Sequence, residues 1–262
     1  MAEEKDSELL ASFNALANLE KDMDAAERDA QWYRLQKTQT IYSKRQEVVS
    51  QIPQFWYLVL VQNDDFADYV DVEDMKYLEV VLDVYVVYED VDHFSITITF
   101  GKDSREDNAI QEQTVTKKFW HVVEDGEDLL HSEAVSVVWP ESLANINPTE
   151  IKARTRGTSM TKEDKKNYRL GMKSFFSWFS WTGTKPGKEF RNGEELARLI
   201  ADDLYPYAVK YFTASLEADN EDDDEDVSTL EGEELDISAD EEEDEKKRKL
   251  ETEDAESRKK QK

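Results

Sequence analysis

The apolar positions of the first 52 residues follow a helical pattern. No proline occurs before Pro53 and no glycine before Gly101, so neither of the two strongest helix breakers interrupts this stretch. Six apolar residues recur at alternating spacings of three and four, which places them on one side of a helix. These six positions, called the helix stripe below, are Leu16, Leu19, Met23, Ala26, Ala30 and Tyr33. We predict a helix over about residues 8–52, about 65 Å long at 1.5 Å per residue.

A helix of that length extends beyond any domain that the rest of the chain could build. The helix stripe therefore needs a partner, and we expect the chain to form a homodimer through it. The alternative is that the helix packs along its own domain. The stripe weakens at Lys37 and Thr40.

The period of the pattern then changes from helical to alternating. Ile52-Pro53 ends the long helix, because the residue before a proline is disfavoured in α conformation, and Pro53 opens a second helix that is rich in apolar residues. Alternation predicts strands over 78–88, 94–100, 113–123 and 135–139. Four consecutive strands with short connections are typical of an antiparallel meander.

Helical spacing returns after the strands. Residues 168–181 hold an aromatic cluster, and 193–218 continue in helical spacing despite Pro206, with Ile200, Leu204 and Tyr207 on the buried side. The predicted fold class is α+β, with a four-stranded sheet covered by helices. We divide the chain into a dimerisation helix (1–52), an α+β domain (53–218) and a tail (219–262).

Charge separates the tail from the rest. The chain has 262 residues and a net charge of −28, and residues 217–262 hold 22 acidic and 8 basic residues, hence half of that charge. Residues 217–245 have eighteen acids and no base, a composition that predicts a disordered polyanion. The basic cluster that follows is typical of a nuclear localisation signal. It consists of Lys246, Lys247, Arg248 and Lys249.

Such a charge favours basic partners. A strongly negative field repels nucleic acid and anionic membranes, so we expect no sequence-specific nucleic-acid binding and no direct membrane contact. Basic residues cluster only in short patches, at Lys117-Lys118 and Lys165-Lys166. Histones are abundant nuclear polycations, and a histone-binding protein of the nucleus, with some in the cytoplasm, is the first hypothesis.

Little in the chain is suited to catalysis. There is no cysteine, and the three histidines do not pair at metal-ligand spacing. The segment 183–189 resembles a phosphate-binding loop, but it has three residues between its glycines, and Glu189 follows the lysine where a hydroxyl is needed. We predict a rigid loop there, no catalytic residue, no metal, no cofactor and no enzymatic activity. The acidic N-terminus, MAEEKDSE, has no apolar segment and predicts no secretory signal.

Paired carboxylates are the candidate binding residues. In the domain they are Asp202, Asp203, Glu194 and Glu195, which either bind a basic partner or form an ordinary solvated face. In the tail they are Glu221, Asp222, Asp223, Asp224, Glu225 and Asp226.

Four blocks resemble the nucleosome assembly protein family. They are IPQFW at 52–56, the strands of 77–100, SFFSWF at 174–179 and IADDLYP at 200–206. The last two resemble its SET branch, and WTGTKPGKEF at 181–190 looks like the fungal subgroup named for vacuolar protein sorting. The resemblance covers about residues 8–216, in order.

The resemblance implies a homodimer with paired long helices, each carrying an "earmuff" domain with an acidic underside. It implies an ATP-independent histone chaperone for H3–H4, with H2A–H2B as a further candidate, and a partner histone acetyltransferase as in the fungal subgroup. The alternative is a regulatory subunit or inhibitor of a nuclear enzyme, without histone deposition.

Overall fold

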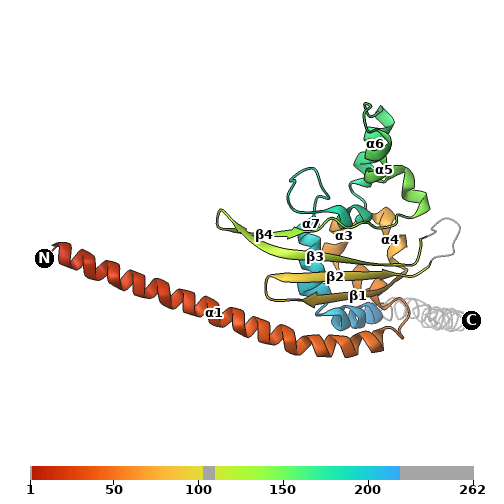
Figure 1. Cartoon of the computed structure of the whole chain (residues 1–262). Helices are drawn as coiled ribbons and strands as arrows, with labels where there is room; N and C mark the ends of the chain where they lie inside the picture. Colours follow the sequence, from red (N-terminus) through yellow and green to blue (C-terminus); the bar gives the residue numbers. More distant parts are fainter. Residues whose placement is uncertain (1, 103–109, 219–262) are drawn as a thin grey trace, which may run out of the picture. The chain divides into compact units, whose positions relative to one another are not determined.

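The long N-terminal helix is confirmed. The computed structural model describes residues 2–102 and 110–218, with side chains from residue 9 on, and α1 runs unbroken over Ala2–Val49. Figure 1 shows it extending well past the rest of the domain. It ends three residues before the predicted boundary. Gln54 then adopts a left-handed conformation with φ 57°, which helps the chain reverse into α2 (Phe55–Val61).

Two short helices with side-chain caps precede the sheet. They are α3 (Asp64–Tyr69) and α4 (Val72–Leu78). Asn63 accepts a hydrogen bond from the backbone of Phe66, and Asp71 accepts one from Glu73, the usual role of such residues before a helix. Leu78 thus belongs to a helix, and the first strand begins three residues later than predicted.

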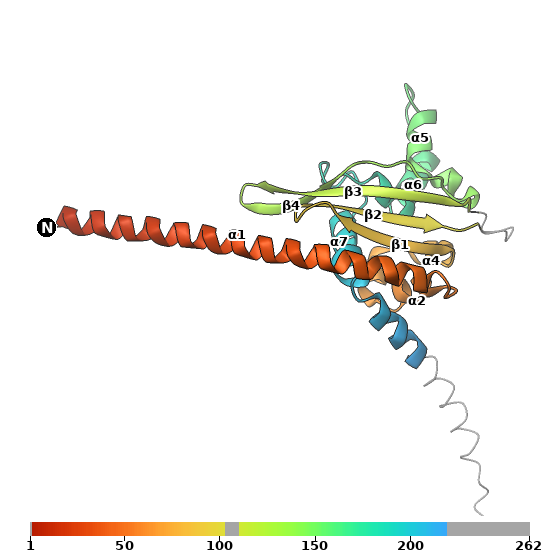
Figure 2. The same cartoon turned by 60° about the horizontal axis from the view of Figure 1, so that its bottom comes forward.

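The sheet is a four-stranded antiparallel meander, as the alternation predicted. Its strands are β1 (Val81–Tyr88), β2 (His93–Phe100), β3 (Gln113–Glu124) and β4 (Glu127–Ser132), paired in chain order. Alternate residues enter the core: Val84 lies opposite Ile98, and Phe94 opposite Phe119. α1 runs along the edge strand β1, to which Gln39 and Gln46 donate side-chain hydrogen bonds (Figure 2).

The predicted position of the fourth strand was wrong. The strand is Glu127–Ser132 instead of 135–139, because Asp125 and Gly126, with φ of 52° and 85°, form a tight turn directly after β3. An Asp-Gly pair between alternating segments is a strong hairpin signal. Residues 135–139 form no strand; Val135 donates its backbone N–H to Phe179, outside the ladder.

The remaining helices are shorter than predicted. They are η1 (Glu141–Ile146), α5 (Pro148–Arg154), α6 (Lys162–Gly171), η2 (Phe175–Ser180), α7 (Gly193–Arg198) and η3 (Leu199–Leu204), with a last helix from residue 208. The predicted helix over 168–181 is therefore split. Its aromatic half forms the 3-10 turn η2, in which Phe175, Trp178 and Phe179 are buried.

The predicted helix over 193–218 is interrupted as well. η3 is a π-helical turn, closed by a hydrogen bond from the Tyr205 backbone N–H to the Ile200 oxygen at 2.9 Å. A π turn adds a residue to the helical repeat, so the helical phase changes there. Ile200 and Leu204 are buried as predicted, but Tyr205 takes the inner position and Tyr207 is 55% exposed.

Candidate functional site

Asp202 and Asp203 project from η3 and are held by tyrosines from other elements. The Tyr88 hydroxyl on β1 donates to exposed Asp202 at 2.9 Å, and the Tyr211 hydroxyl donates to half-buried Asp203 at 2.6 Å. Both tyrosines therefore fix carboxylates that still face outward. The hydrogen bond to Asp203, followed by burial, raises the pKa of Tyr211.

This acidic surface continues onto α3, which the sequence interpretation missed. Asn63, the cap of α3, donates to the Tyr211 hydroxyl at 3.2 Å, so α3 is joined through Tyr211 to Asp203. The negative charge of Asp65 also raises the pKa of Tyr211, which places it near the same hydroxyl. We call the carboxylates of these two elements the acidic face: Asp64, Asp65, Asp68, Asp202 and Asp203. The spacing of the three residues on α3 was the available signal.

Glu194 and Glu195 differ from each other. Glu194 accepts a hydrogen bond from Arg198 Nε at 2.9 Å, and the same guanidinium lies 3.3 Å from Asp128 on β4. Arg198 therefore offsets the charge of Glu194. Glu195 is exposed. Of this predicted pair, Glu195 is the more available carboxylate.

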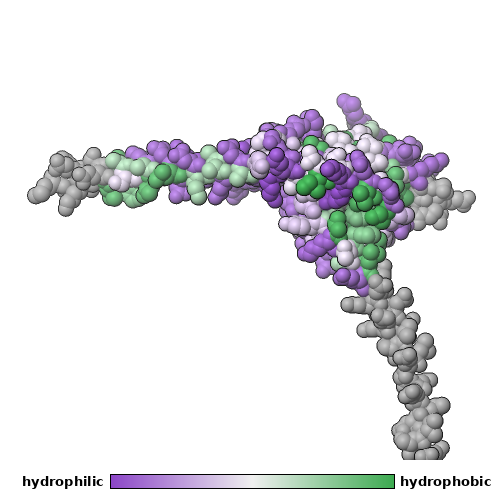
Figure 3. All heavy atoms as spheres, turned by 90° about the horizontal axis from the view of Figure 1, so that it is seen from below, coloured by the Kyte–Doolittle hydropathy of each residue, from purple (hydrophilic) through white to green (hydrophobic). Residues whose placement is uncertain are grey.

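The helix stripe faces solvent in the single chain. All six of its residues are exposed, among them Leu19 at 62% and Met23 at 60%, and apolar atoms recur along α1 in Figure 3. Packing on the chain's own domain applies only to the later part of α1, where Tyr42 packs against the core and Val49 is buried. The stripe is therefore not covered by the chain's own described residues.

Lys117 is buried, contrary to its interpretation as half of a surface basic patch. Its ammonium group donates to the backbone oxygens of Glu133, Phe179 and Trp181 at 2.7, 3.0 and 2.6 Å. Burial lowers its pKa to about 7. It ties β3 to η2, and the alternation of the strand was the only signal that it points inward.

Glu189 organises the loop that resembled a phosphate-binding loop. Its carboxylate accepts hydrogen bonds from the backbone N–H groups of Thr182, Gly183 and Lys185 at 3.2, 3.0 and 3.3 Å. The residue that breaks the phosphate-loop pattern thus occupies the backbone donors itself. This supports the prediction of a rigid loop.

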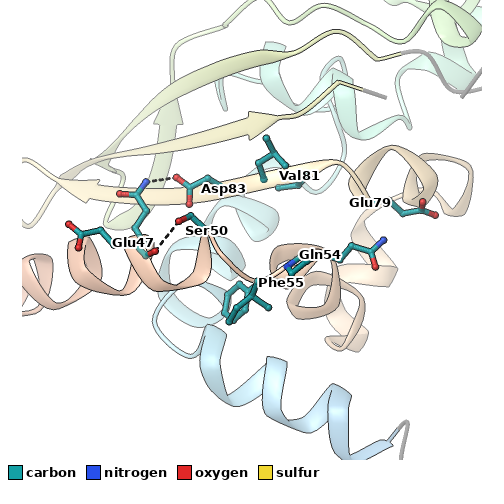
Figure 4. Close-up of a pocket in the computed structure, with 11 residues that line it drawn as sticks. Glu47, Ser50, Gln54, Phe55, Glu79, Val81 and Asp83 are labelled. Atoms are coloured by element: carbon teal, nitrogen blue, oxygen red, sulfur yellow. Dashed lines mark hydrogen bonds between the residues drawn. The ribbon is translucent and has the colours of Figure 1, made fainter. Parts of the chain in front are cut away.

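A hollow at the base of α1 holds further carboxylates. Figure 4 shows it between the end of α1, the turn into α2 and the start of β1, with Glu47, Glu79 and Asp83 among its lining residues. Burial raises the pKa of Asp83, and Gln46 donates a hydrogen bond to it. Apolar Phe55 and Val81 line the same hollow. Here, too, the surface combines negative charge with apolar groups.

Other predicted sites were searched for over the described ranges. Within them, no three His, Cys, Asp or Glu side chains are grouped so that they could hold a metal ion. No helix of the described part is long and apolar enough to cross a bilayer. The predicted tail carboxylates at 221–226 and the basic cluster at 246–249 lie outside the described residues.

Comparisons with known proteins agree on one family. The sequence pattern described as Nucleosome assembly protein (NAP) matches residues 3–215. The chain is 38% identical to vacuolar protein sorting-associated protein 75 of Saccharomyces cerevisiae, over 85% of this chain and 84% of that protein. It is 27% identical to NAP1-related protein 2 of Arabidopsis thaliana, over 85% and 83%.

Solved structures give the same result. The crystal structure of the Vps75 histone chaperone matches with a TM-score of 0.70 and 38% identity, over 79% of this chain and 98% of that chain. The crystal structure of Ccp1 matches with a TM-score of 0.57 and 26% identity, over 78% and 95%.

Proposed function

Because the chain belongs to the nucleosome assembly protein family, we propose that it is an ATP-independent nuclear histone chaperone. Its cargo is H3–H4, with H2A–H2B as a second candidate, and it aids nucleosome assembly. The observation that supports this proposal is the acidic face, in which carboxylates of α3 and η3 are joined through Tyr211 and directed outward.

The proposed mechanism is charge shielding. Histones bind DNA largely through contacts between basic side chains and phosphates. The acidic face and the acidic tail cover these basic side chains and prevent aggregation. An exposed ion pair contributes only about 0.2–1 kcal/mol, so affinity must come from many weak contacts. Binding of that kind is salt-sensitive, and histones can pass to DNA without ATP.

We propose a division of labour along the chain. Residues 1–52 join two copies through the helix stripe, 53–218 form the domain that carries the acidic face, and 219–262 add a polyanionic tail and the nuclear localisation signal. The proposed histone contacts also include Glu194, Glu195 and the carboxylates of 221–226. Because Glu194 is paired with Arg198, we expect it to contribute least.

We further propose that the protein stimulates a partner histone acetyltransferase. The alternative is a regulatory subunit or inhibitor of a nuclear enzyme without deposition activity. Removing residues 217–262 distinguishes these roles, because tail loss weakens charge-based histone binding but spares an enzyme that docks on the folded domain.

The acidic face is tested in a tail-less chain, residues 1–216, that carries Asp202→Asn and Asp203→Asn. Asparagine keeps an oxygen that accepts from Tyr88 and Tyr211, so the fold is expected to survive. We expect weaker H3–H4 binding and a shallower salt dependence, measured by fluorescence titration between 50 and 300 mM NaCl.

The matched control changes the β3–β4 turn instead. Glu124→Gln with Asp125→Asn removes the same charge from two exposed residues on that hairpin, and it should bind H3–H4 like the unmodified 1–216 chain. Unchanged binding by the Asp202/Asp203 variant would show that these carboxylates form only a solvated face.

A further inference from the structure

Helix α6 carries a row of cations on a chain that is otherwise strongly acidic. The row includes the short Lys165-Lys166 patch noted in the sequence and extends it along one side of the helix. Spacings of three and four keep its members together. We call this row the basic stripe: Lys162, Lys165, Lys166, Arg169 and Lys173. All five side chains are exposed.

The basic stripe is not neutralised by its own neighbours. The nearby carboxylate Asp164 is engaged elsewhere: it accepts hydrogen bonds from Thr161 in a capping box and from Arg154 at 2.7 Å. Among the residues that the structure describes, none of the five cations takes part in an ion pair. Their charge therefore remains available to a partner.

The position of α6 limits repulsion from the acidic parts of the domain. In Figure 1, α5 and α6 stand off from the sheet on the side away from α1. Charges farther away than about 8 Å are largely screened at physiological ionic strength. A partner at the stripe is thus governed mainly by local positive charge, although the whole chain has a net charge of −28.

We propose that the basic stripe binds the phosphate backbone of duplex DNA without reading its sequence. The five cations span eleven residues, about 16 Å of helix, a length over which duplex DNA presents about ten phosphate charges. Four of the five are lysines and none is aromatic. Such groups contact phosphates and do not recognise bases.

An acidic protein fits the stripe less well. Protein interfaces have an apolar core and are depleted in lysine, whereas Leu170 is the one apolar residue that lies beside these cations in the same hollow. A uniform polyanion needs no apolar anchor. DNA is therefore the partner that this surface matches.

DNA contact extends the proposed chaperone function, on which it rests only for its biological purpose. Histones held at the acidic face would be released while the stripe keeps the protein beside DNA. The affinity must be low, on the order of 10⁻⁴ to 10⁻⁶ M, as for other non-specific contacts. Low affinity prevents the chaperone from competing with its own product.

The test measures binding of the full-length protein to a fluorescein-labelled 30-base-pair duplex by anisotropy at 50, 100 and 200 mM NaCl. The stripe variant is Lys162→Glu, Lys165→Glu, Lys166→Glu and Arg169→Glu. We expect it to lose at least tenfold in affinity at 50 mM NaCl. Each lost phosphate contact should also reduce the slope of log K against log salt by about 0.9.

A matched control separates the local stripe from the global charge. Lys102→Glu, Lys185→Glu, Lys188→Glu and Lys210→Glu alter the net charge equally at exposed positions outside α6. This control should keep most of the DNA affinity. An equal loss in both variants would overturn the proposal, as would a wild-type protein that does not bind the duplex at 50 mM NaCl.

Two further measurements complete the test. If light scattering shows that the stripe variant loses mass while its DNA affinity is unchanged, the stripe contacts a second copy and the proposal is wrong. Should circular dichroism show that the fourfold variant is unfolded, Lys162→Gln with Lys166→Gln must still weaken DNA binding. H3–H4 binding by the stripe variant should stay unchanged, so failure here is distinct from failure of the acidic face.

Discussion

Single buried polar residues link the segments of this domain. Asp74, only 2% exposed, accepts hydrogen bonds from the Phe175 backbone at 2.6 Å and from the Ser174 hydroxyl at 3.1 Å. It thereby holds the start of η2 against α4, about a hundred residues away in sequence. Burial raises its pKa from 3.8 to about 6, although both hydrogen bonds oppose the change.

Asp74 should make stability depend on pH in a predictable direction. Its folded pKa lies above its unfolded pKa, so the folded state retains the proton to higher pH. Stability from this group is complete below about pH 4 and is lost as pH rises through 6. The loss is about 3 kcal/mol at most, from about 1.4 kcal/mol for each pH unit between the two pKa values.

The Asp74→Asn variant isolates this effect. Its side-chain oxygen still accepts from Phe175, but it does not titrate. In urea unfolding from pH 4 to 7.5, the wild type should lose more stability than the variant as the pH rises. Parallel curves for the two proteins would show that Asp74 is not the titrating group.

At the scale of elements, α1 carries two separate apolar surfaces. Its last turns pack on the domain through Tyr42 and Val49, while the helix stripe is left to another partner. The Arg28 guanidinium pairs with Asp92 in the β1–β2 turn at 2.5 Å, and this pairing lowers the pKa of Asp92. α1 thus contacts the domain as far back as residue 28, and the stripe begins before it.

We expect Leu19→Asp with Met23→Asp to convert a dimer into a monomer. Both side chains are exposed in the single chain, so the substitution should leave the domain folded. In a dimer it would bury unpaired charges, at several kcal/mol for each ion. Light scattering at micromolar concentration measures the mass.

Gln31→Asp with Gln36→Asp is the control for the dimer prediction. It adds the same charge at exposed polar positions of α1 outside the helix stripe and should leave the mass unchanged. A Leu19/Met23 variant that keeps the mass of a dimer would disprove the assignment of the stripe.

At the scale of the whole molecule, charge is arranged in blocks. Half of the net charge belongs to residues 217–262, and the basic cluster at 246–249 directly follows the acidic run. The other half belongs to the first 216 residues, where the acidic face and the basic stripe lie on different elements. This arrangement gives one chain surfaces for partners of opposite charge.

The basic cluster should direct nuclear import. A fluorescent fusion that lacks residues 246–262 should lose nuclear enrichment, as seen by microscopy. Because a histone cargo could carry the truncated protein into the nucleus, residues 217–262 are also fused alone to the reporter. This isolated tail should enter the nucleus, and replacement of Lys246, Lys247, Arg248 and Lys249 by alanine should abolish its entry. A cytoplasmic tail fusion would contradict the prediction.

Local pattern was sufficient for much of this fold. The spacing of Leu16 to Tyr33 identified α1 and its exposed side, and alternation identified three strands, because helix and strand periods depend only on neighbours in sequence. The fourth strand was misplaced although Asp125-Gly126 marked the turn. Its error came from giving the alternation at 135–139 more weight than the turn.

Tertiary packing decided the rest. The burial of Lys117 depends on three backbone oxygens from segments 16 to 64 residues away, and no local pattern contains such a partner. Tyr207 was placed inside by a regular helical period, which the π turn of η3 changes. The acidic face joins residues about 140 positions apart through Asn63 and Tyr211. Charge and periodicity are properties of the chain, whereas a shared surface exists only after distant segments have packed.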